Sequence, residues 1–101
     1  MTEPLVLEGV DGSITVTAGA LNRLVVRAAE GIDGVSVRRP RRSVEVSHGD
    51  GRATVSLGLA VRYGEAAPEL ARGVQERVRA ALSASCGLEI DGVDVAVEAI
   101  G

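Results

Sequence analysis

Residues 59–78 read LAVRYGEAAPELARGVQERV, an alternating strand that turns through Tyr63-Gly64 into an amphipathic helix. Pro68 suits the first turn of this helix, because its missing N–H has no hydrogen-bond partner to lose there. Apolar residues then recur at spacings of three and four, which predicts one buried stripe. The stripe consists of Ala67, Leu70, Ala71, Val74, Val78, Ala81 and Leu82. We expect the rest of the chain to be arranged around this strand and helix.

The strand that enters this stretch extends back to Val55. Its inward residues are expected to be Val55, Leu57, Leu59 and Val61. This alternation predicts the longest strand of the sheet, in a central or next-to-central position. Before it, residues 48–51 (His-Gly-Asp-Gly) predict a hairpin loop, because they tolerate positive φ. A shorter strand with Val44 and Val46 leads into that loop.

The N-terminal half predicts a strand, a helix and a second strand. Ile14 and Val16 alternate with polar residues, and Thr17 is placed to cap a helix by accepting from a first-turn amide. Gly31 is expected to end that helix with a positive φ. The helix stripe is Leu21, Leu24, Val25, Ala28 and Ala29, and the strand after it contains Val35 and Val37. Residues 1–10 are either a first strand or a flexible or docking tail.

The last strand is predicted by the alternation of Val93, Val95, Val97 and Ala99. The pattern Ile-Asp-Gly-Val-x-Val occurs at 32–37 and at 90–95, so both helices are expected to return to a strand through the same turn. The opposite faces of the strands carry Ser, Thr, Arg and Glu, which places both helices on one side. We therefore predict one α+β domain over residues 1–101. It is a two-layer sandwich with a mixed sheet of about four to five strands and two helices packed on one face.

The composition restricts the classes of function. The chain is 46% apolar and 25% charged, which is typical of a globular domain. It has one Tyr and no Phe or Trp, which disfavours proteins that bind nucleic acid by stacking bases on rings. A net charge of -3 also argues against a dedicated polyanion binder. No apolar run approaches the roughly 18 residues of a membrane-spanning helix, so we expect no direct membrane insertion.

Cys86 and His48 are the residues to consider for chemistry. A single cysteine excludes an internal disulfide, and no cationic, apolar leader begins the sequence, which together predict a cytoplasmic protein. Neither residue has neighbours suited to metal binding or nucleophilic catalysis, so we interpret Cys86 as a packed thiol and His48 as a solvated loop residue. The GxxG at 31–34 is interpreted as a helix-to-strand turn. We expect no enzymatic activity, no metal and no cofactor.

Four arginines surround Pro40 and form the arginine loop: Arg38, Arg39, Arg41 and Arg42. Guanidinium groups on a tight loop are suited to phosphates, lipid head groups or an acidic protein surface. A solvated loop without a ligand is the alternative. A third interpretation is contact with the acidic C-terminal strand of a neighbouring copy.

Several motifs occur in a fixed order along the chain. They are Glu30-Gly31-Ile32-Asp33-Gly34-Val35, Tyr63-Gly64, Pro68-Glu69-Leu70-Ala71, Val74-Gln75-Glu76-Arg77-Val78, Gly87-Leu88, Val93-Asp94-Val95-Ala96-Val97 and Ile100. In this order they resemble the alkaline shock protein family of bacterial envelope stress response proteins. The resemblance extends from about Gly9 to Ile100.

The resemblance implies a non-enzymatic cytoplasmic protein of cell-envelope homeostasis that self-associates. In some members of the family, a separate anchor protein holds the protein near the membrane. The resemblance therefore implies a homo-oligomer or a paralogous copy as partner, and a membrane-anchor protein as a second one. It transfers no catalytic residue, and nucleic acid remains disfavoured.

We predict the partner surface at the corner that carries the family pattern and on the outward helix face after it. This corner–helix surface consists of Tyr63, Glu65, Glu69, Arg72 and Glu76. The alternative function is a small regulatory nucleic-acid- or phospholipid-binding module that uses the arginine loop.

Overall fold

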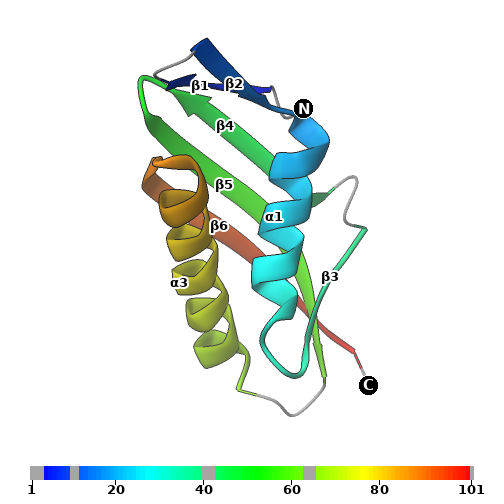
Figure 1. Cartoon of the computed structure of the whole chain (residues 1–101). Coiled ribbons are helices and arrows are strands. Elements are labelled where there is room, and N and C mark those ends of the chain that lie inside the picture. Colours follow the sequence, from blue (N-terminus) through cyan, green and yellow to red (C-terminus); the bar gives the residue numbers. More distant parts are fainter. Residues whose placement is uncertain (1–3, 10–11, 40–42, 63–65, 101) are drawn as a thin grey trace.

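The computed structural model describes residues 4–9, 12–39, 43–62 and 66–100 (Figure 1). The strands are β1 (Leu5–Gly9), β2 (Gly12–Val16), β3 (Val35–Val37), β4 (Glu45–Gly49), β5 (Arg52–Arg62) and β6 (Glu89–Ile100), and the helices are α1 (Ala18–Glu30) and α3 (Ala67–Cys86). The predicted α+β class is confirmed. The described strands form a four-stranded sheet and a separate two-stranded sheet of β1 and β2.

β5 is the central strand of the four-stranded sheet. It pairs antiparallel with β3 and β4 and parallel with β6. The β6 ladder follows β5 from Arg52 to Arg62, so β3 and β4 share the other side of β5. The parallel pair is possible because α3 carries the chain back along the sheet between β5 and β6 (Figure 1). The central position predicted for this strand is confirmed.

The hairpin between β4 and β5 is tighter than the sequence predicted. β4 continues to Gly49, and His48 lies within the ladder opposite Ala53, partly buried. The turn is Asp50-Gly51, and both residues have positive φ, 54° and 74°. Two such residues match the twist of the flanking strands, so a two-residue turn is favoured over a longer loop. The prediction that His48 lies in a solvated loop was therefore wrong.

Both helices lie on one face of the sheet (Figure 1). The predicted cap of α1 is confirmed, because the Thr17 hydroxyl accepts from the Ala20 N–H at 3.1 Å. Gly31 was predicted to have positive φ, but its φ is -70°. α1 instead ends in a tight turn, in which the Val35 N–H donates to the Ile32 carbonyl at 3.3 Å and Gly34 takes the positive φ of 86°.

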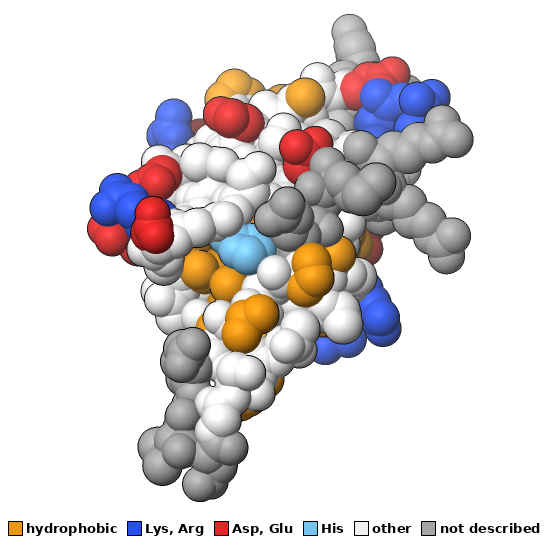
Figure 2. Space-filling model, turned by 90° about the horizontal axis from the view of Figure 1, so that it is seen from above, with side chains coloured by type: hydrophobic (Ala, Val, Ile, Leu, Met, Phe, Trp, Pro, Cys, Tyr) orange, Lys and Arg blue, Asp and Glu red, His pale blue; other side chains and the backbone are white. Residues whose placement is uncertain are grey.

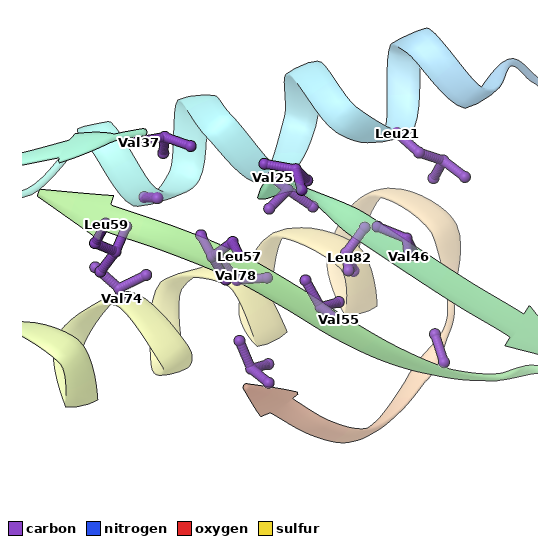
Figure 3. Close-up of a cluster of buried hydrophobic side chains, with 14 of the residues drawn as sticks. Leu21, Val25, Val37, Val46, Val55, Leu57, Leu59, Val74, Val78 and Leu82 are labelled. Carbon is purple, nitrogen blue, oxygen red and sulfur yellow. The ribbon is translucent and has the colours of Figure 1, made fainter. Parts of the chain in front are cut away.

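The core lies between the helices and the inward face of the sheet (Figure 3). Both predicted helix stripes face it. Their fully buried members are Leu21, Val25, Ala29, Val74, Val78 and Leu82. The strands contribute Val46, Val55, Leu57, Leu59 and Val61. Cys86 is also buried in this cluster, and burial raises the pKa of its thiol. The core is aliphatic, since the chain has no Phe or Trp.

Glycine allows the two helices to approach closely. A Cβ built on Gly73 of α3 would lie 3.0 Å from Cδ1 of Ile32, which follows α1. A Cβ on Gly31 would lie 2.6 Å from Nη1 of Arg77, so the Arg77 side chain covers the end of α1. Small residues at these contacts allow close packing in a core without aromatic side chains. Short aliphatic side chains fill the space between two backbones only when those backbones lie close together.

The first strands form a ribbon beside the main sheet at one end of the molecule (Figure 1). The ladder of β1 and β2 runs from Leu5 opposite Val16 to Gly9 opposite Gly12. Leu5 is 7% exposed and belongs to the core, while Leu7 and Val16 pack against it. The ribbon is therefore held by one apolar face rather than by strand pairing with the main sheet.

We predict that Leu82→Ala lowers the free energy of unfolding by about 2–5 kcal/mol, because it leaves a cavity among fully buried side chains. Urea unfolding followed by circular dichroism measures the change. Arg79→Ala, on the exposed side of the same helix, is the control, and its effect is expected to stay within about 0.5 kcal/mol. Equal destabilisation by the two substitutions would contradict the observed packing of α3.

Candidate functional site

The corner–helix surface is partly visible in the structure. Glu69, Arg72 and Glu76 are exposed on α3, on the side away from buried Val74 and Val78. Tyr63 and Glu65 lie outside the described residues. The helix therefore presents two carboxylates and one guanidinium to solvent, a mixed charge pattern that suits a protein surface of complementary pattern.

Gln75 connects α3 to the outer strand of the sheet. Its side-chain amide Nε2 donates to the carbonyl oxygen of Val93 in β6 at 2.9 Å. This bond satisfies a carbonyl of an edge strand and fixes the helix over that strand. The sequence pattern placed Gln75 only within a motif. The signal for its role was its position as an uncharged polar residue directly beside the buried stripe.

The arginine loop is described only at its two ends. Arg38 forms an ion pair with Glu98 of β6, and its backbone N–H donates to the Gly58 carbonyl at 2.9 Å. Arg39 is exposed and has a φ of 43°. Its carbonyl accepts from the Ser43 N–H at 2.9 Å, and the Ser43 hydroxyl donates to the Arg38 carbonyl. Arg41 and Arg42 lie outside the described residues.

The ion pair between Arg38 and Glu98 changes the electrostatic interpretation of this loop. The loop and the acidic last strand were expected to meet, if at all, between neighbouring copies. One such contact occurs within the chain, where β3 and β6 flank β5. Both side chains are about half exposed, so the pair contributes little stability. It does balance the charge of Arg38.

A second ion cluster lies at the opposite end of β5. Arg52 Nε donates to Asp91 Oδ1 at 3.0 Å, and Arg52 Nη1 lies 3.5 Å from Glu89 Oε2. The hydrogen bond from Arg52 lowers the pKa of Asp91 and raises that of Arg52. Figure 2 shows acidic and basic side chains side by side at this edge of the molecule. The sequence did not predict the cluster, because its members meet only through the parallel pairing of β5 with β6.

A shallow hollow of about 280 Å³ lies on the outward side of α1. Ala20 and Leu24 form its apolar part, and Arg23 and Arg27 lie beside them.

Within the described ranges, no three His, Cys, Asp or Glu side chains are grouped as a metal site would need. The described helices include none that is long and apolar enough to cross a membrane.

Residues 36–101 of the 101-residue chain match the model of a protein family that is described as having a cell envelope-related function. The chain belongs to the alkaline shock protein family. The match begins in β3 and contains β4, β5, α3 and β6. The described part of the corner–helix surface, the Arg38–Glu98 ion pair and the Arg52 ion cluster therefore lie within the segment that the family model matches. A comparison with curated proteins gives no match.

Solved structures of MamM-CTD variants have a similar fold. One with a single His-to-Ala change is 21% identical, covers 82% of this chain and 98% of that chain, and has a TM-score of 0.56. A triple variant is 20% identical, and the match covers 82% of this chain and 95% of the variant, with a TM-score of 0.57. A cadmium form of another variant is 23% identical, and the match covers 82% of this chain and 96% of the variant, with a TM-score of 0.56. At these identities the likeness shows the fold alone.

We predict that Gln75→Met lowers the free energy of unfolding by about 1 kcal/mol, because the Val93 carbonyl loses its donor. Chemical unfolding measures the change. Glu76→Met on the same helix is the matched control, since it replaces an exposed side chain at the next position. A Gln75 variant as stable as this control would show that the hydrogen bond contributes nothing.

The ion cluster predicts a pH dependence that Asp91→Asn removes. A carboxyl whose folded pKa is lowered stabilises the folded state above its unfolded pKa of about 3.9, and this contribution is lost as the pH falls through the folded pKa. The melting temperature of the wild type is expected to exceed that of Asp91→Asn at neutral pH. The difference is expected to shrink as the pH falls below about 4 and to disappear once the pH is below the folded pKa of Asp91. Thermal unfolding between about pH 7 and about pH 2 tests this, and a constant difference over the range would contradict it.

Proposed function

We propose that this member of the alkaline shock protein family is a non-enzymatic, cytoplasmic protein of cell-envelope homeostasis. It acts by self-association and by binding other proteins. The observation that carries the proposal is the family match over residues 36–101, with its cell envelope-related function. The family resemblance adds the two partner classes, which are a second or paralogous copy and a membrane-anchor protein.

The proposed binding site for another protein is the corner–helix surface. Its described members Glu69, Arg72 and Glu76 are all exposed and lie on one rigid helix. The inward side of this helix is held by Val74, Val78 and the Gln75 hydrogen bond to β6. A helix that is fixed by packing and by a hydrogen bond to the sheet loses little conformational entropy when a partner binds to its exposed side. This favours recognition by protein contacts.

Binding of nucleic acid or phospholipid by the arginine loop is the alternative. Among the described loop residues, Arg38 is balanced by Glu98, and Arg39 is the exposed guanidinium. A phosphate ligand would have to compete with the Glu98 carboxylate for Arg38. We therefore favour the protein-binding function and include the alternative as an outcome of the test.

The test is purification of the tagged full chain from its native host after cross-linking, followed by identification of the captured molecules. Glu76→Arg is expected to reduce capture of the protein partner by about tenfold or more, because juxtaposed like charges cost several kcal/mol at an interface. Asp94→Arg makes the same charge change on an exposed residue of β6 and is expected to leave capture unchanged.

Unchanged capture by Glu76→Arg would remove the corner–helix surface from the proposal. A variant with Arg38, Arg39, Arg41 and Arg42 all changed to Ser tests the alternative. Loss of nucleic acid or lipid in that variant, with the protein partners retained, would favour the binding module over the protein-binding function.

A further inference from the structure

The ribbon of β1 and β2 exposes large apolar side chains. Val6 is 55% exposed and Ile14 is 61% exposed. The cross-strand register places Ile14 opposite Leu7, and Val16 opposite Leu5, so these four side chains share one face. Leu5, Leu7 and Val16 meet the core, but Ile14 extends beyond it. Figure 2 shows hydrophobic side chains gathered on this end of the molecule.

β2 also has an open backbone edge. Among the described residues it pairs only with β1, and Gly12 to Thr15 are all exposed. Its sequence, Gly-Ser-Ile-Thr-Val, contains no charge and no proline. Charged side chains, proline and bulges are the devices that soluble proteins use to prevent strand addition at an edge. β2 uses none of them and carries two β-branched apolar residues.

The other open strand edges are less suited to a second copy of the chain. β6 carries Glu89, Asp91, Asp94 and Glu98, so pairing with itself would bring like charges together. The Gln75 amide already occupies one of its carbonyls. On the opposite side of the sheet, the edge is formed by two short strands, β3, which ends at Val37, and β4, which begins at Glu45. β1, which also pairs on one side only among the described residues, carries Glu8 in its sequence, so the charge pattern favours β2 for self-pairing.

We propose that β2 pairs antiparallel with β2 of a second copy, about a twofold axis at Ile14. The inference rests on the proposed self-association and names its contact. In this register Ile14 lies opposite Ile14 of the second copy, and Ser13 lies opposite Thr15 of that copy. Both are favourable cross-strand pairs without charge. The two ribbons become one four-stranded sheet, and the apolar row from Leu7 through Ile14 continues into the second copy.

A strand of five residues makes a small contact, well below the roughly 1,600 Å² of a standard protein interface. The dimer is therefore weak and depends on concentration. The dimer is sensitive to charge at position 14, because the twofold axis places this side chain opposite the same side chain of the second copy. Equal charges at position 14 of the two chains repel each other, whereas opposite charges on two different variants attract.

The test is sedimentation velocity of the full chain over a series of concentrations. Ile14→Asp and Ile14→Arg are each expected to raise the dimer dissociation constant by about tenfold or more. An equimolar mixture of the two variants is expected to associate again as a heterodimer. Val6→Asp and Val6→Arg are the matched controls, because Val6 is similarly exposed on the other strand of the ribbon. Circular dichroism verifies that each variant is folded.

The outcomes separate this inference from the proposed function. If the wild type associates and Ile14→Asp associates equally, the contact is wrong while self-association stands. The same conclusion follows if the Val6 variants weaken association as much, or if the mixture stays monomeric. If the wild type is monomeric up to about 1 mM, both this contact and the proposed self-association fail.

Discussion

Pairing of β5 on both of its sides is the constraint on which the rest of the structure depends. One side is taken by β3 and β4 and the other by β6, and its inward side chains are buried beneath both helices. A parallel β5–β6 pair requires a long crossover, and α3 supplies it. The position of α3, and with it the corner–helix surface, therefore follows from the pairing of one strand.

An aliphatic core makes the second demand on the chain. Valine, leucine and alanine bury less area per residue than aromatic side chains, so the layers must approach closely. Gly73 accommodates Ile32, and Gly31 lies beneath the Arg77 side chain. On the same helix, the Gln75 side chain donates to the Val93 carbonyl of β6 at 2.9 Å. α3 therefore contributes both to the packing against the end of α1 and to the protection of the β6 edge.

The strand edges of the molecule differ in charge and in pairing. β6 is acidic, contributes to two ion clusters and accepts a side-chain hydrogen bond from α3. β2 is neutral and open among the described residues. The proposed action by association would need some surfaces that reject copies of the chain and one that accepts them. The proposed protein-binding helix face and the proposed β2 contact lie on different elements, so both can be occupied together.

The sequence by itself determined the α+β class, both helix stripes, the Thr17 cap and the central place of β5, because these depend on local periodicity and capping. It also carried the family motifs. It predicted a hairpin at residues 48–51, but not that the turn is limited to Asp50-Gly51, because the twist of the flanking strands favours the two-residue turn. It also did not predict the ordinary φ of Gly31, since the turn after α1 places the positive φ at Gly34. The pairs Arg52–Asp91, Arg38–Glu98 and Gln75–Val93 were decided only by tertiary structure. Each joins segments far apart in the chain, which meet only after β6 has taken its place beside β5.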